Sequence, residues 1–339
     1  MGLLERLEKG PVLGAEGYIF ELERRGHVQA GAYVPEVVLD YPAAVRELHR
    51  EFLRAGSDVM VALTYYAHRE KLRVIGREND LEPMNRAALR LAREAAREGD
   101  ALVAGNICNT WAYDLDDKAA SGAEVRRQYT EQVGWAVEEG VDFVLAETLE
   151  YAGEALIALE VIKGFGLPAV INFSAIYDQT KDGYGWVEAC RILKNAGADV
   201  VGFNCARGPE TLLPLVRDLR QAVDGPIAAV PVPYHTTART PAFQFLRNRD
   251  QSNAYTLGLD RHLSTRAEVA DFAKAAREIG VDYLGLCCGA GPHHFRALAE
   301  AVGRVTPASR YSPDMSQHGL LGADKVVRKS EKQFLAKWE

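Results

Sequence analysis

The stretches VVGFNC (residues 200–205) and YLGLCC (residues 283–288) indicate both a fold and a chemistry. Each is a short apolar run that ends in cysteine, and such runs are consistent with buried strands. The sulfurs of Cys205, Cys287 and Cys288 would therefore follow directly after two buried strands. If they meet in space, they form a zinc site with three protein ligands. The fourth tetrahedral position then stays open, as in catalytic rather than structural zinc sites.

Further apolar runs alternate with longer amphipathic stretches along the chain. The predicted strands cover residues 12–14, 59–63, 101–105, 143–147, 169–172, 200–204, 227–230 and 283–286. Apolar residues at three- and four-residue spacing predict helices over residues 41–55, 84–98, 125–139, 153–163, 186–196, 210–222, 266–279 and 292–302. Eight strand–helix units without a compositional break predict an α/β protein with a single (β/α)8 TIM barrel. A doubly wound open sheet is the alternative, because periodicity alone does not exclude it.

Glycines just after several predicted helices support these boundaries. A glycine at a helix C-terminus takes the left-handed conformation without steric cost. We expect five glycines to end their helices in this way: Gly56, Gly99, Gly140, Gly197 and Gly280.

Two segments fall outside the repeating pattern. Residues 236–262 form a long connection after the seventh predicted strand, and loops of that length are usually functional or disordered. Residues 306–339 are polar but end in Phe334, Leu335 and Trp338, and exposed apolar residues mark contacts. We therefore expect residues 1–305 to be the barrel and residues 306–339 to be a C-terminal oligomerisation arm. A homo-oligomer, dimer or tetramer, is predicted.

Composition limits the classes of function. The chain has 339 residues and a net charge of −7, and no dense block of Lys and Arg argues for a nucleic-acid partner. No apolar stretch is long enough to span a bilayer, and residues 1–10 lack the apolar centre of a signal peptide. Five cysteines are an odd number for a disulfide framework. We expect reduced thiols that are free to bind metal, and hence a cytoplasmic protein.

The carboxyl ends of the predicted strands are rich in cysteine, tyrosine, asparagine and glutamate. In TIM barrels the active site lies at these ends. The residues predicted there are Glu16, Gly17, Thr64, Tyr65, Tyr66, Asn106, Glu147, Asn172, Phe173, Ser174, Asn204, Cys205, Tyr234, His235, Cys287 and Cys288. Two cysteines lie elsewhere: Cys108 is beyond the third strand, and Cys190 is inside a predicted helix, where we interpret it as a small core residue.

Other interpretations of these motifs stay open. The adjacent cysteines Cys287 and Cys288 are also compatible with plain buried thiols or with a strained vicinal disulfide. His235 is interpreted as a polar residue of the rim rather than a ligand. The Gly-x-Gly at residues 289–291 is a weak dinucleotide signal because no acidic partner follows on a second strand, although an anion could bind at the helix that begins near Pro292.

A site with three thiolates favours one kind of chemistry. Three thiolates leave zinc with net negative charge, which makes it a poor hydrolytic Lewis acid but a good site for a fourth thiol. Binding removes the proton of that thiol at neutral pH. A metal-held thiolate stays nucleophilic toward a carbon electrophile, so the ligand set indicates thiol alkylation rather than hydrolysis.

The two cysteine stretches, GFNC (residues 202–205) and GLCCG (residues 285–289), resemble the zinc signature of the homocysteine S-methyltransferases. The resemblance covers roughly residues 3–302. Several stretches resemble the betaine-dependent branch of that family: GYIFELERRG (17–26), YP (41–42), HREFLRAGS (49–57), TYYA (64–67), YHT (234–236) and PHH (292–294).

The resemblance implies a TIM barrel with one zinc ion, Zn2+, held by Cys205, Cys287 and Cys288. It implies homocysteine as the acceptor and a betaine-like quaternary ammonium or sulfonium compound as the methyl donor, with methionine as product. Glu147 corresponds to a glutamate that binds the homocysteine amino group, and Tyr66 to a tyrosine that faces the zinc and the donor; these two are the predicted catalytic residues. The expected substrate-binding residues are Glu16, Gly17, Tyr33, Tyr65, Asn106, Thr148 and Asn204.

Three positions depart from the family's pattern. Ala15-Glu16-Gly17 stands where the family has Asp-Gly-Gly or Asp-Gly-Ala, so the acidic group is displaced by one residue. Thr148 replaces an aromatic residue of the betaine branch, and Tyr33 replaces a tryptophan. Aromatic faces hold onium groups by cation–π attraction, most strongly with tryptophan. These changes point to a different donor, so that glycine betaine is one candidate among several, beside dimethylsulfonio acids, cyclic betaines and other methylated ammonium compounds.

The sequence is also compared with three other classes of function. The altered Ala15-Glu16 loop also fits a ligand-binding or regulatory protein on the same scaffold. A cobalamin- or folate-dependent methyltransferase is disfavoured because the chain lacks the Asp-x-His-x-x-Gly signature. A zinc hydrolase is disfavoured because no His-rich triad is present.

Overall fold

The eight predicted strands form a closed parallel barrel in which each strand pairs with its neighbours in chain order. The computed structural model describes residues 1–29, 31, 33–255, 258–314, 316, 333 and 336–337. The strands are β1 (Val12–Ala15), β2 (Val59–Val61), β3 (Leu102–Cys108), β4 (Phe143–Leu149), β5 (Ala169–Phe173), β6 (Val200–Asn204), β7 (Ile227–Val230) and β8 (Tyr283–Leu286). β8 pairs with β1 in parallel, which closes the barrel and excludes the doubly wound open sheet.

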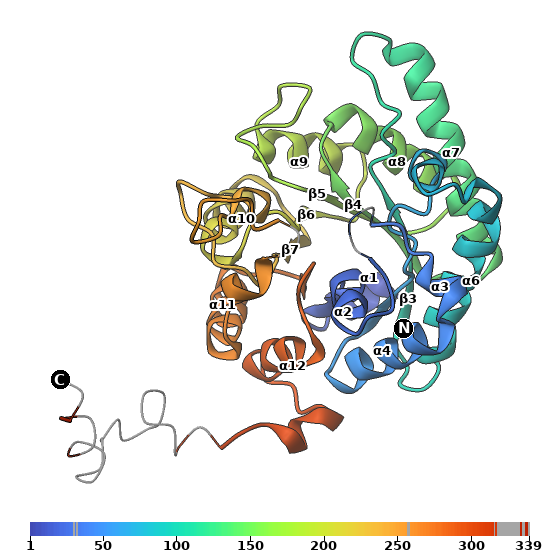
Figure 1. The fold of residues 1–339 in the computed structure, drawn as a ribbon. Coiled ribbons are helices and arrows are strands. Elements are labelled where there is room, and N and C mark those ends of the chain that lie inside the picture. The colour runs from blue at the N-terminus through green and yellow to red at the C-terminus, as the bar shows by residue number, and fades with distance from the viewer. Residues whose placement is uncertain are drawn as a thin grey trace.

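Helices surround the barrel because every strand is followed by an amphipathic segment (Figure 1). The helices predicted from periodicity are α4 (Pro42–Arg54), α6 (Leu81–Ala96), α7 (Lys118–Glu138), α8 (Ala152–Gly164), α9 (Trp186–Asn195), α10 (Pro209–Ala222), α11 (Arg266–Ile279) and α12 (Pro292–Ala301). Their apolar faces and the outward sides of the strands form a large core, and a second, smaller cluster that includes Met60, Leu89 and Val103 lies between α6 and the strands β2 and β3. α11 has the clearest boundaries: Thr265 and Glu268 form a capping box at its start, and Gly280 ends it with φ +87°.

Some boundaries differ from the prediction. β3 and β4 are longer than predicted and end at Cys108 and Leu149. Their backbones stay paired as far as Cys108 and Glu147, so the pairing continues through residues with polar side chains. β2 ends already at Val61. Four of the five predicted helix-ending glycines have positive φ; Gly99 does not, and Asp100 takes the left-handed conformation in its place.

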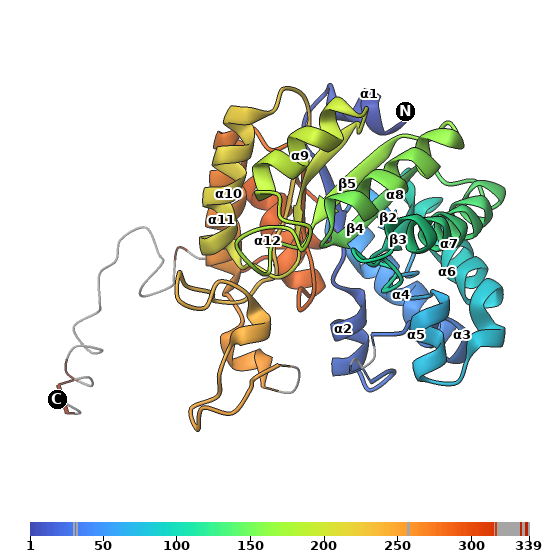
Figure 2. The ribbon, with the colours of Figure 1, turned by 90° about the horizontal axis from the view of Figure 1, so that it is seen from above.

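Shorter helices that periodicity did not predict lie at the rim, at the start of the chain and after α12. They are α1 (Leu3–Leu7), α2 (Tyr18–Arg24), α3 (Val37–Asp40) and α5 (Arg69–Val74), with the short 3-10 helices η1 (Glu78–Asp80), η2 (Phe243–Phe245), η3 (Leu259–His262) and η4 (Pro307–Tyr311). Figure 2 shows α2, α3, α5 and the connection after β7 projecting on one side of the barrel. They lie on the side of the carboxyl ends of the strands, whereas α1 lies on the opposite side of the barrel.

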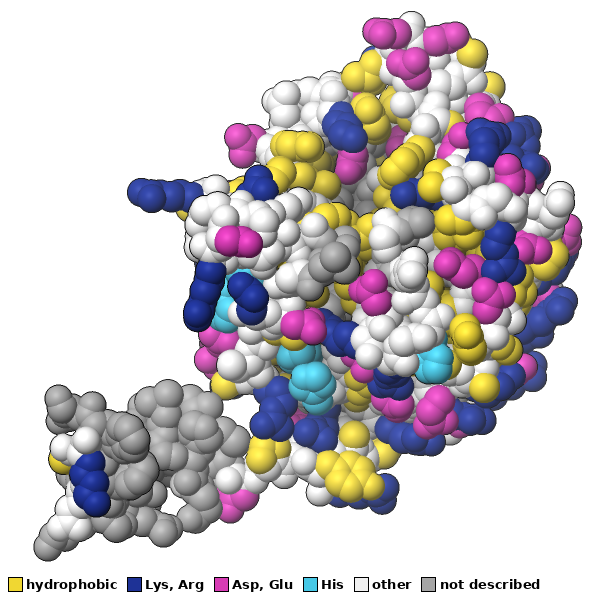
Figure 3. Space-filling model, in the orientation of Figure 1, with side chains coloured by type: hydrophobic (Ala, Val, Ile, Leu, Met, Phe, Trp, Pro, Cys, Tyr) yellow, Lys and Arg dark blue, Asp and Glu magenta, His cyan; other side chains and the backbone are white. Residues whose placement is uncertain are grey.

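Figure 3 shows basic and acidic side chains interspersed over the face in view. Within the described part of the chain, no helix is long and apolar enough to cross a membrane. Most of the predicted arm, residues 306–339, lies outside the described residues, so the boundary at residue 305 and the arm stay predictions.

Candidate metal and substrate site

The sulfur atoms of Cys205, Cys287 and Cys288 meet at one end of the barrel, all within 4.8 Å of one another. The Sγ atom of Cys288 lies 3.9 Å from that of Cys205 and 3.8 Å from that of Cys287. A tetrahedral zinc ion with zinc–sulfur bonds of about 2.3 Å places its ligand sulfurs about 3.8 Å apart. All three are free thiols, so no vicinal disulfide forms. The spacing and the donor atoms therefore fit a metal ion.

The backbone brings the three sulfurs together through the strand that lies between them. β7 pairs with β6 on one side and with β8 on the other. The amide of Cys205 donates to the carbonyl of Val230 (2.9 Å), and the amide of Cys287 donates to the carbonyl of Pro231 (2.8 Å). Two consecutive carbonyls at the end of β7 thus fix both cysteine segments at the same height in the barrel.

The pKa values of the three thiols shift in opposite directions. Hydrogen bonds from the neighbouring thiols of Cys287 and Cys288 lower the pKa of Cys205, so its thiolate form is favoured. The same hydrogen bonds with Cys205 raise the pKa of Cys287 and of Cys288. Without a cation, a second thiolate would be costly in this buried place. A bound metal cation supplies the positive charge that lets all three become thiolates.

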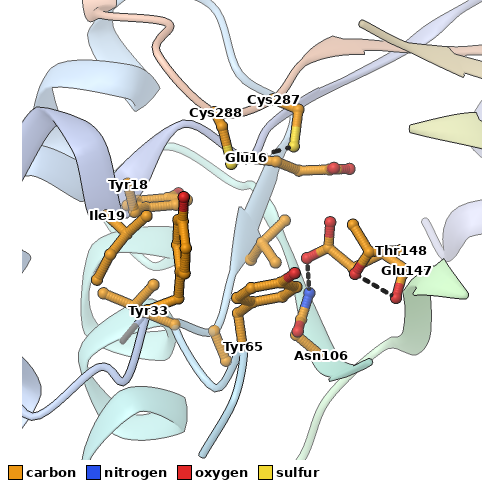
Figure 4. A pocket seen from close by; sticks show the side chains of 13 residues that line it. Glu16, Tyr18, Ile19, Tyr33, Tyr65, Asn106, Glu147, Thr148, Cys287 and Cys288 are labelled. Carbon is orange, nitrogen blue, oxygen red and sulfur yellow. Dashed lines mark hydrogen bonds between the residues drawn. The ribbon is translucent and has the colours of Figure 1, made fainter. Parts of the chain in front are cut away.

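A pocket opens beside the sulfurs and contains most of the residues predicted from the sequence (Figure 4). Its lining consists of Glu16, Tyr18, Ile19, Tyr33, Val61, Ala62, Leu63, Tyr65, Asn106, Glu147, Thr148, Cys287 and Cys288. Tyr18 and Ile19 were not predicted, because the helix α2 that carries them was not recognised in the sequence. Their apolar run after Gly17 was the only signal.

Two buried carboxylates occupy the floor of this pocket. Oxygen atoms of Glu16 and Glu147 and the Sγ atom of Cys287 lie within 4.8 Å of one another. Glu147 accepts hydrogen bonds from the side-chain amides of Asn106 and of Asn204, the latter at 2.6 Å. In the described part of the chain, the Glu16 oxygens have no hydrogen-bond partner. Burial first and neighbouring negative charge second raise the pKa of both carboxyl groups. A cationic ligand group would relieve this repulsion.

One residue from the long connection, Tyr255, packs on Tyr33, an aromatic residue of the pocket lining. The hydroxyl of Tyr33 donates to the hydroxyl of Tyr255, and the two rings stack with centroids 6.1 Å apart. Thiolate charge on Cys205 and Cys288 contributes to the raised pKa of both tyrosines, after burial as the main cause. Tyr255 was missed because residues 236–262 show no periodicity that would aim a side chain at the site.

Two predicted site residues, Tyr66 and Gly17, have a different environment from the one expected, whereas Thr148 lies in the pocket. Tyr66 packs on Tyr65 with ring centroids 4.2 Å apart, but its hydroxyl accepts a hydrogen bond from Trp111 and it does not line the pocket. Gly17 begins α2, and a Cβ atom there would lie 2.4 Å from the carbonyl oxygen of Ala290, so close packing explains the glycine. Thr148 lines the pocket, and its amide donates to Asn204.

Strained backbone gathers around this site. Among the described residues other than glycine, positive φ occurs at Tyr33 (58°), Tyr66 (58°), Trp111 (62°), Thr148 (54°), Cys205 (55°) and Ala206 (49°), and elsewhere only at Asp100 and Gln251. Such conformations cost roughly 1–2 kcal/mol per residue and persist where the surrounding structure enforces them. Their concentration here indicates a functional site rather than a chance cavity.

The remaining polar residues of the rim do not join the three sulfurs. His235 lies at the surface, with Nε2 3.5 Å from Glu268. The Sγ atom of Cys108 accepts a hydrogen bond from the amide of Tyr66, and Cys190 is buried in the core, as expected. The glycines at residues 289–291 lead into α12, and no dinucleotide-type site is indicated by their surroundings.

Comparison with known proteins agrees with this geometry. The sequence model of the homocysteine S-methyltransferase family matches residues 17–302 of this chain. Betaine–homocysteine S-methyltransferase 1 of Danio rerio is 37% identical over 338 residues, 95% of this chain and 80% of that protein. An S-methylmethionine–homocysteine S-methyltransferase of Pongo abelii is 36% identical over 330 residues, 95% of this chain and 86% of its own length.

Among solved structures, the metallated form of the Escherichia coli homocysteine methyltransferase MmuM has the same fold. It superimposes with a TM-score of 0.69 at 20% identity and covers 88% of this chain and 99% of its own. The family match spans most of the chain and the sequence identity to curated relatives exceeds one third. The chain therefore belongs to the homocysteine S-methyltransferase family.

Proposed function

We propose that this protein transfers a methyl group from a betaine-like quaternary ammonium or sulfonium compound to homocysteine, and that it releases methionine and the demethylated donor. The observation that carries the proposal is the tetrahedral spacing of three sulfurs beside a buried pair of carboxylates. The named relatives act on homocysteine with betaine or S-methylmethionine, one an ammonium and the other a sulfonium donor.

Cys205, Cys287 and Cys288 are proposed as the ligands of one Zn2+ ion. Soft thiolate ligands in a tetrahedral arrangement select zinc among the common divalent ions. When bound, the ion offers its open position to the acceptor sulfur and keeps that sulfur as a thiolate at neutral pH.

Glu147 and Glu16 are proposed to bind the α-ammonium group of homocysteine. Both are buried next to Cys287, and together they attract one positive charge into the floor of the pocket. Asn106 and Asn204 hold the Glu147 carboxylate in place by two hydrogen bonds. The amino acid is thereby oriented with its side-chain sulfur toward the three cysteines.

The aromatic wall is proposed to hold the methylated cation. Tyr33 and Tyr65 line the pocket, and Tyr255 stacks on Tyr33. Aromatic rings of this kind suit an onium group by cation–π attraction. As the thiolate sulfur bonds to the methyl carbon, the bond from that carbon to the donor's nitrogen or sulfur breaks, and its electron pair leaves with the donor. The leaving group is neutral, so alignment and exclusion of water are the protein's main tasks.

The need to keep the three thiols reduced limits the cellular compartment in which the enzyme can work. A reducing cytoplasm is proposed, because oxidation of neighbouring thiols would destroy the ligand set. A dimer or tetramer with homocysteine and the onium compound as its small-molecule substrates is also proposed.

A donor panel tests the function. Zinc-loaded protein is incubated with homocysteine and single donors, including glycine betaine, S-methylmethionine, dimethylsulfonioacetate and proline betaine, and methionine is measured by mass spectrometry. Formation of methionine with at least one donor supports the proposal. No methionine with any donor, although metal is bound and homocysteine shifts the melting temperature, would instead favour a ligand-binding or regulatory protein.

A further inference from the structure

Helix α2 lies against the segment that follows the two adjacent cysteines. Gly17 at its N-cap, Glu21 and Arg24 are spaced by four and three residues, so they lie on one face of the helix. A Cβ atom at Gly17 would lie 2.4 Å from the carbonyl oxygen of Ala290. A Cβ atom at Gly291 would lie 3.3 Å from a carboxylate oxygen of Glu21. This face of α2 is therefore in close contact with the chain immediately after the metal-binding cysteines.

The segment after Cys287 forms a tight turn that a cation holds. The amide of Ala290 donates to the carbonyl of Cys287 at 3.1 Å, and Gly289 has φ +94°, a conformation that glycine adopts without steric cost. The Nη1 atom of Arg24 donates to the carbonyl of Gly289 at 2.9 Å. A second contact limits the same residue, because a Cβ atom at Gly289 would lie 2.3 Å from the hydroxyl oxygen of Tyr234. The turn is thus fixed by groups from two other parts of the chain.

The contacts of Arg24 differ in strength. Its Nε and Nη2 atoms donate to Asp260 in the long connection, at 3.1 and 2.9 Å, but the side chain of Asp260 is 72% exposed. An exposed ion pair contributes little, because water screens it and both side chains lose freedom. The hydrogen bond to the carbonyl of Gly289 is partly buried, and its donor is charged, which makes it stronger than a neutral one. Asp260 therefore orients the guanidinium, and the bond to Gly289 holds the turn.

The other end of α2 carries part of the substrate pocket. Glu16 directly precedes the helix, and Tyr18 and Ile19 lie in its first turn; all three line the pocket (Figure 4). The acceptor amino acid is proposed to reach from the carboxylate of Glu16 to a metal ion beside Cys288. Covalent bonds fix the length of that molecule, so both of its ends bind well only where the two ends of the site keep a fixed separation.

We propose that Arg24 is a positioning residue, which holds α2 against the turn after Cys288 and thereby sets the distance between Glu16 and the metal ion. The assignment rests on the proposed binding of homocysteine and deepens it. Arg24 touches neither substrate nor metal and acts through the carbonyl of Gly289. Without this contact, a thiol still reaches the metal, but its ammonium group no longer meets Glu16 at the same time. Arg24 is thus the source of selectivity for a thiol that carries an amino group.

Two thiols that differ by an amino group test the inference through binding alone. Cobalt(II)-loaded wild type and Arg24→Met are titrated with homocysteine and with 4-mercaptobutanoate, and the change in visible absorption as the thiolate joins the cobalt ion gives each Kd. Arg24→Met keeps the apolar stem of the side chain. We expect it to raise the Kd for homocysteine about 10- to 100-fold, as for other residues that support a metal site from outside its ligands, and to change the Kd for 4-mercaptobutanoate much less.

Two further variants control for general effects on the fold. Arg25 is the next residue in the chain and pairs with Glu21 at 2.9 Å and with Glu51 at 2.6 Å. Arg25→Met removes both ion pairs at the same end of α2 and should leave both Kd values as in wild type. Arg24→Lys retains a cation that donates to Gly289 or pairs with Asp260, but lacks the fork that does both. Its Kd for homocysteine should lie between those of wild type and Arg24→Met.

The outcomes separate the inference from the function on which it rests. An unchanged Kd for homocysteine in Arg24→Met, or an equal rise for both thiols, would overturn the positioning role. If Arg24→Met does not bind cobalt, the ratio of the two Kd values in Arg24→Lys decides in the same way. If homocysteine binds but no donor of the panel gives methionine, the proposed methyl transfer fails while the Kd values still decide the role of Arg24. If homocysteine leaves the cobalt spectrum of wild type unchanged, both fail.

Discussion

The Sγ atoms of Cys205 and Cys288 lie 3.9 Å apart although 83 residues separate them in the chain. They meet because the backbones of Cys205 and Cys287 both donate hydrogen bonds to the end of β7, at Val230 and Pro231. The left-handed conformation of Cys205, with φ 55°, turns its chain at this point. A barrel strand thus acts as the spacer that sets the sulfur–sulfur distance, and the distance is the one that a tetrahedral zinc site requires.

Replacing one of these cysteines should remove the metal. In Cys205→Ala only two sulfurs remain, and we expect bound zinc to fall from about one per chain to near zero. Turnover should fall by more than the roughly 10- to 100-fold that is typical when a residue that only hydrogen-bonds to a metal ligand is replaced. Elemental analysis of freshly purified protein and the homocysteine assay measure the two effects. Cys190→Ala is the control, since Cys190 is buried in α9 away from the site and should leave zinc content unchanged. Full activity in Cys205→Ala would contradict the ligand assignment.

Glu147 should bind the amino group of the acceptor and should not affect the reactivity of its sulfur. Glu147→Gln removes the charge but keeps the shape, and we expect kcat/KM for homocysteine to fall about 10- to 150-fold, as for the loss of a hydrogen bond to a charged group. 4-Mercaptobutanoate, which has the thiol but no amino group, serves as the reference acceptor. Its reactivity should change much less in the variant. Equal losses with both thiols would place Glu147 outside amino-group recognition.

The hydroxyl pair of Tyr33 and Tyr255 links the long connection to the pocket. Tyr255→Phe removes the hydrogen bond but keeps the ring, so we expect the KM for the onium donor to rise about two- to tenfold while the KM for homocysteine stays constant. Tyr184→Phe, at an exposed tyrosine on the β5–α9 connection, is the matched control. If the homocysteine KM rises instead, Tyr255 belongs to the acceptor side of the site.

His49 should make stability depend on pH. It is fully buried in α4 against the ring of Tyr18, and burial lowers its pKa to about 3. The unfolded chain binds a proton near the ordinary pKa of about 6.5, whereas the folded protein does not until about pH 3. The unfolded state therefore gains protons as pH falls between these values, and stability is lost below about 6.5 and constant above it.

The expected size of this effect follows from the same linkage. Between pH 7 and pH 5, the free energy of unfolding should drop by about 2 kcal/mol on account of His49. Urea unfolding of wild type and His49→Phe at both values measures it, with the variant losing correspondingly less. Because the difference between two pH values is compared, any packing change from the larger ring cancels. Identical pH dependence of the two proteins would refute the assignment.

The order of strands and helices was predictable because each strand is a short apolar run and the helices between them carry apolar residues at three- and four-residue spacing. The ligand set followed from where Cys205 and Cys288 fall relative to those runs. Glu147 and Thr148 were placed at or after a strand end, but β4 continues to Leu149, since pairing inside a barrel tolerates polar side chains. The place of Tyr255 beside Tyr33 depends on how the long connection folds back in space, and local sequence has no signal for it.

X-ray absorption at the zinc edge tests the central claim most directly. The purified protein should show three sulfur scatterers at about 2.3 Å and one lighter scatterer, and addition of homocysteine should convert the shell to four sulfurs. Fewer than three sulfurs around the ion, or a shell that homocysteine leaves unchanged, would contradict the account.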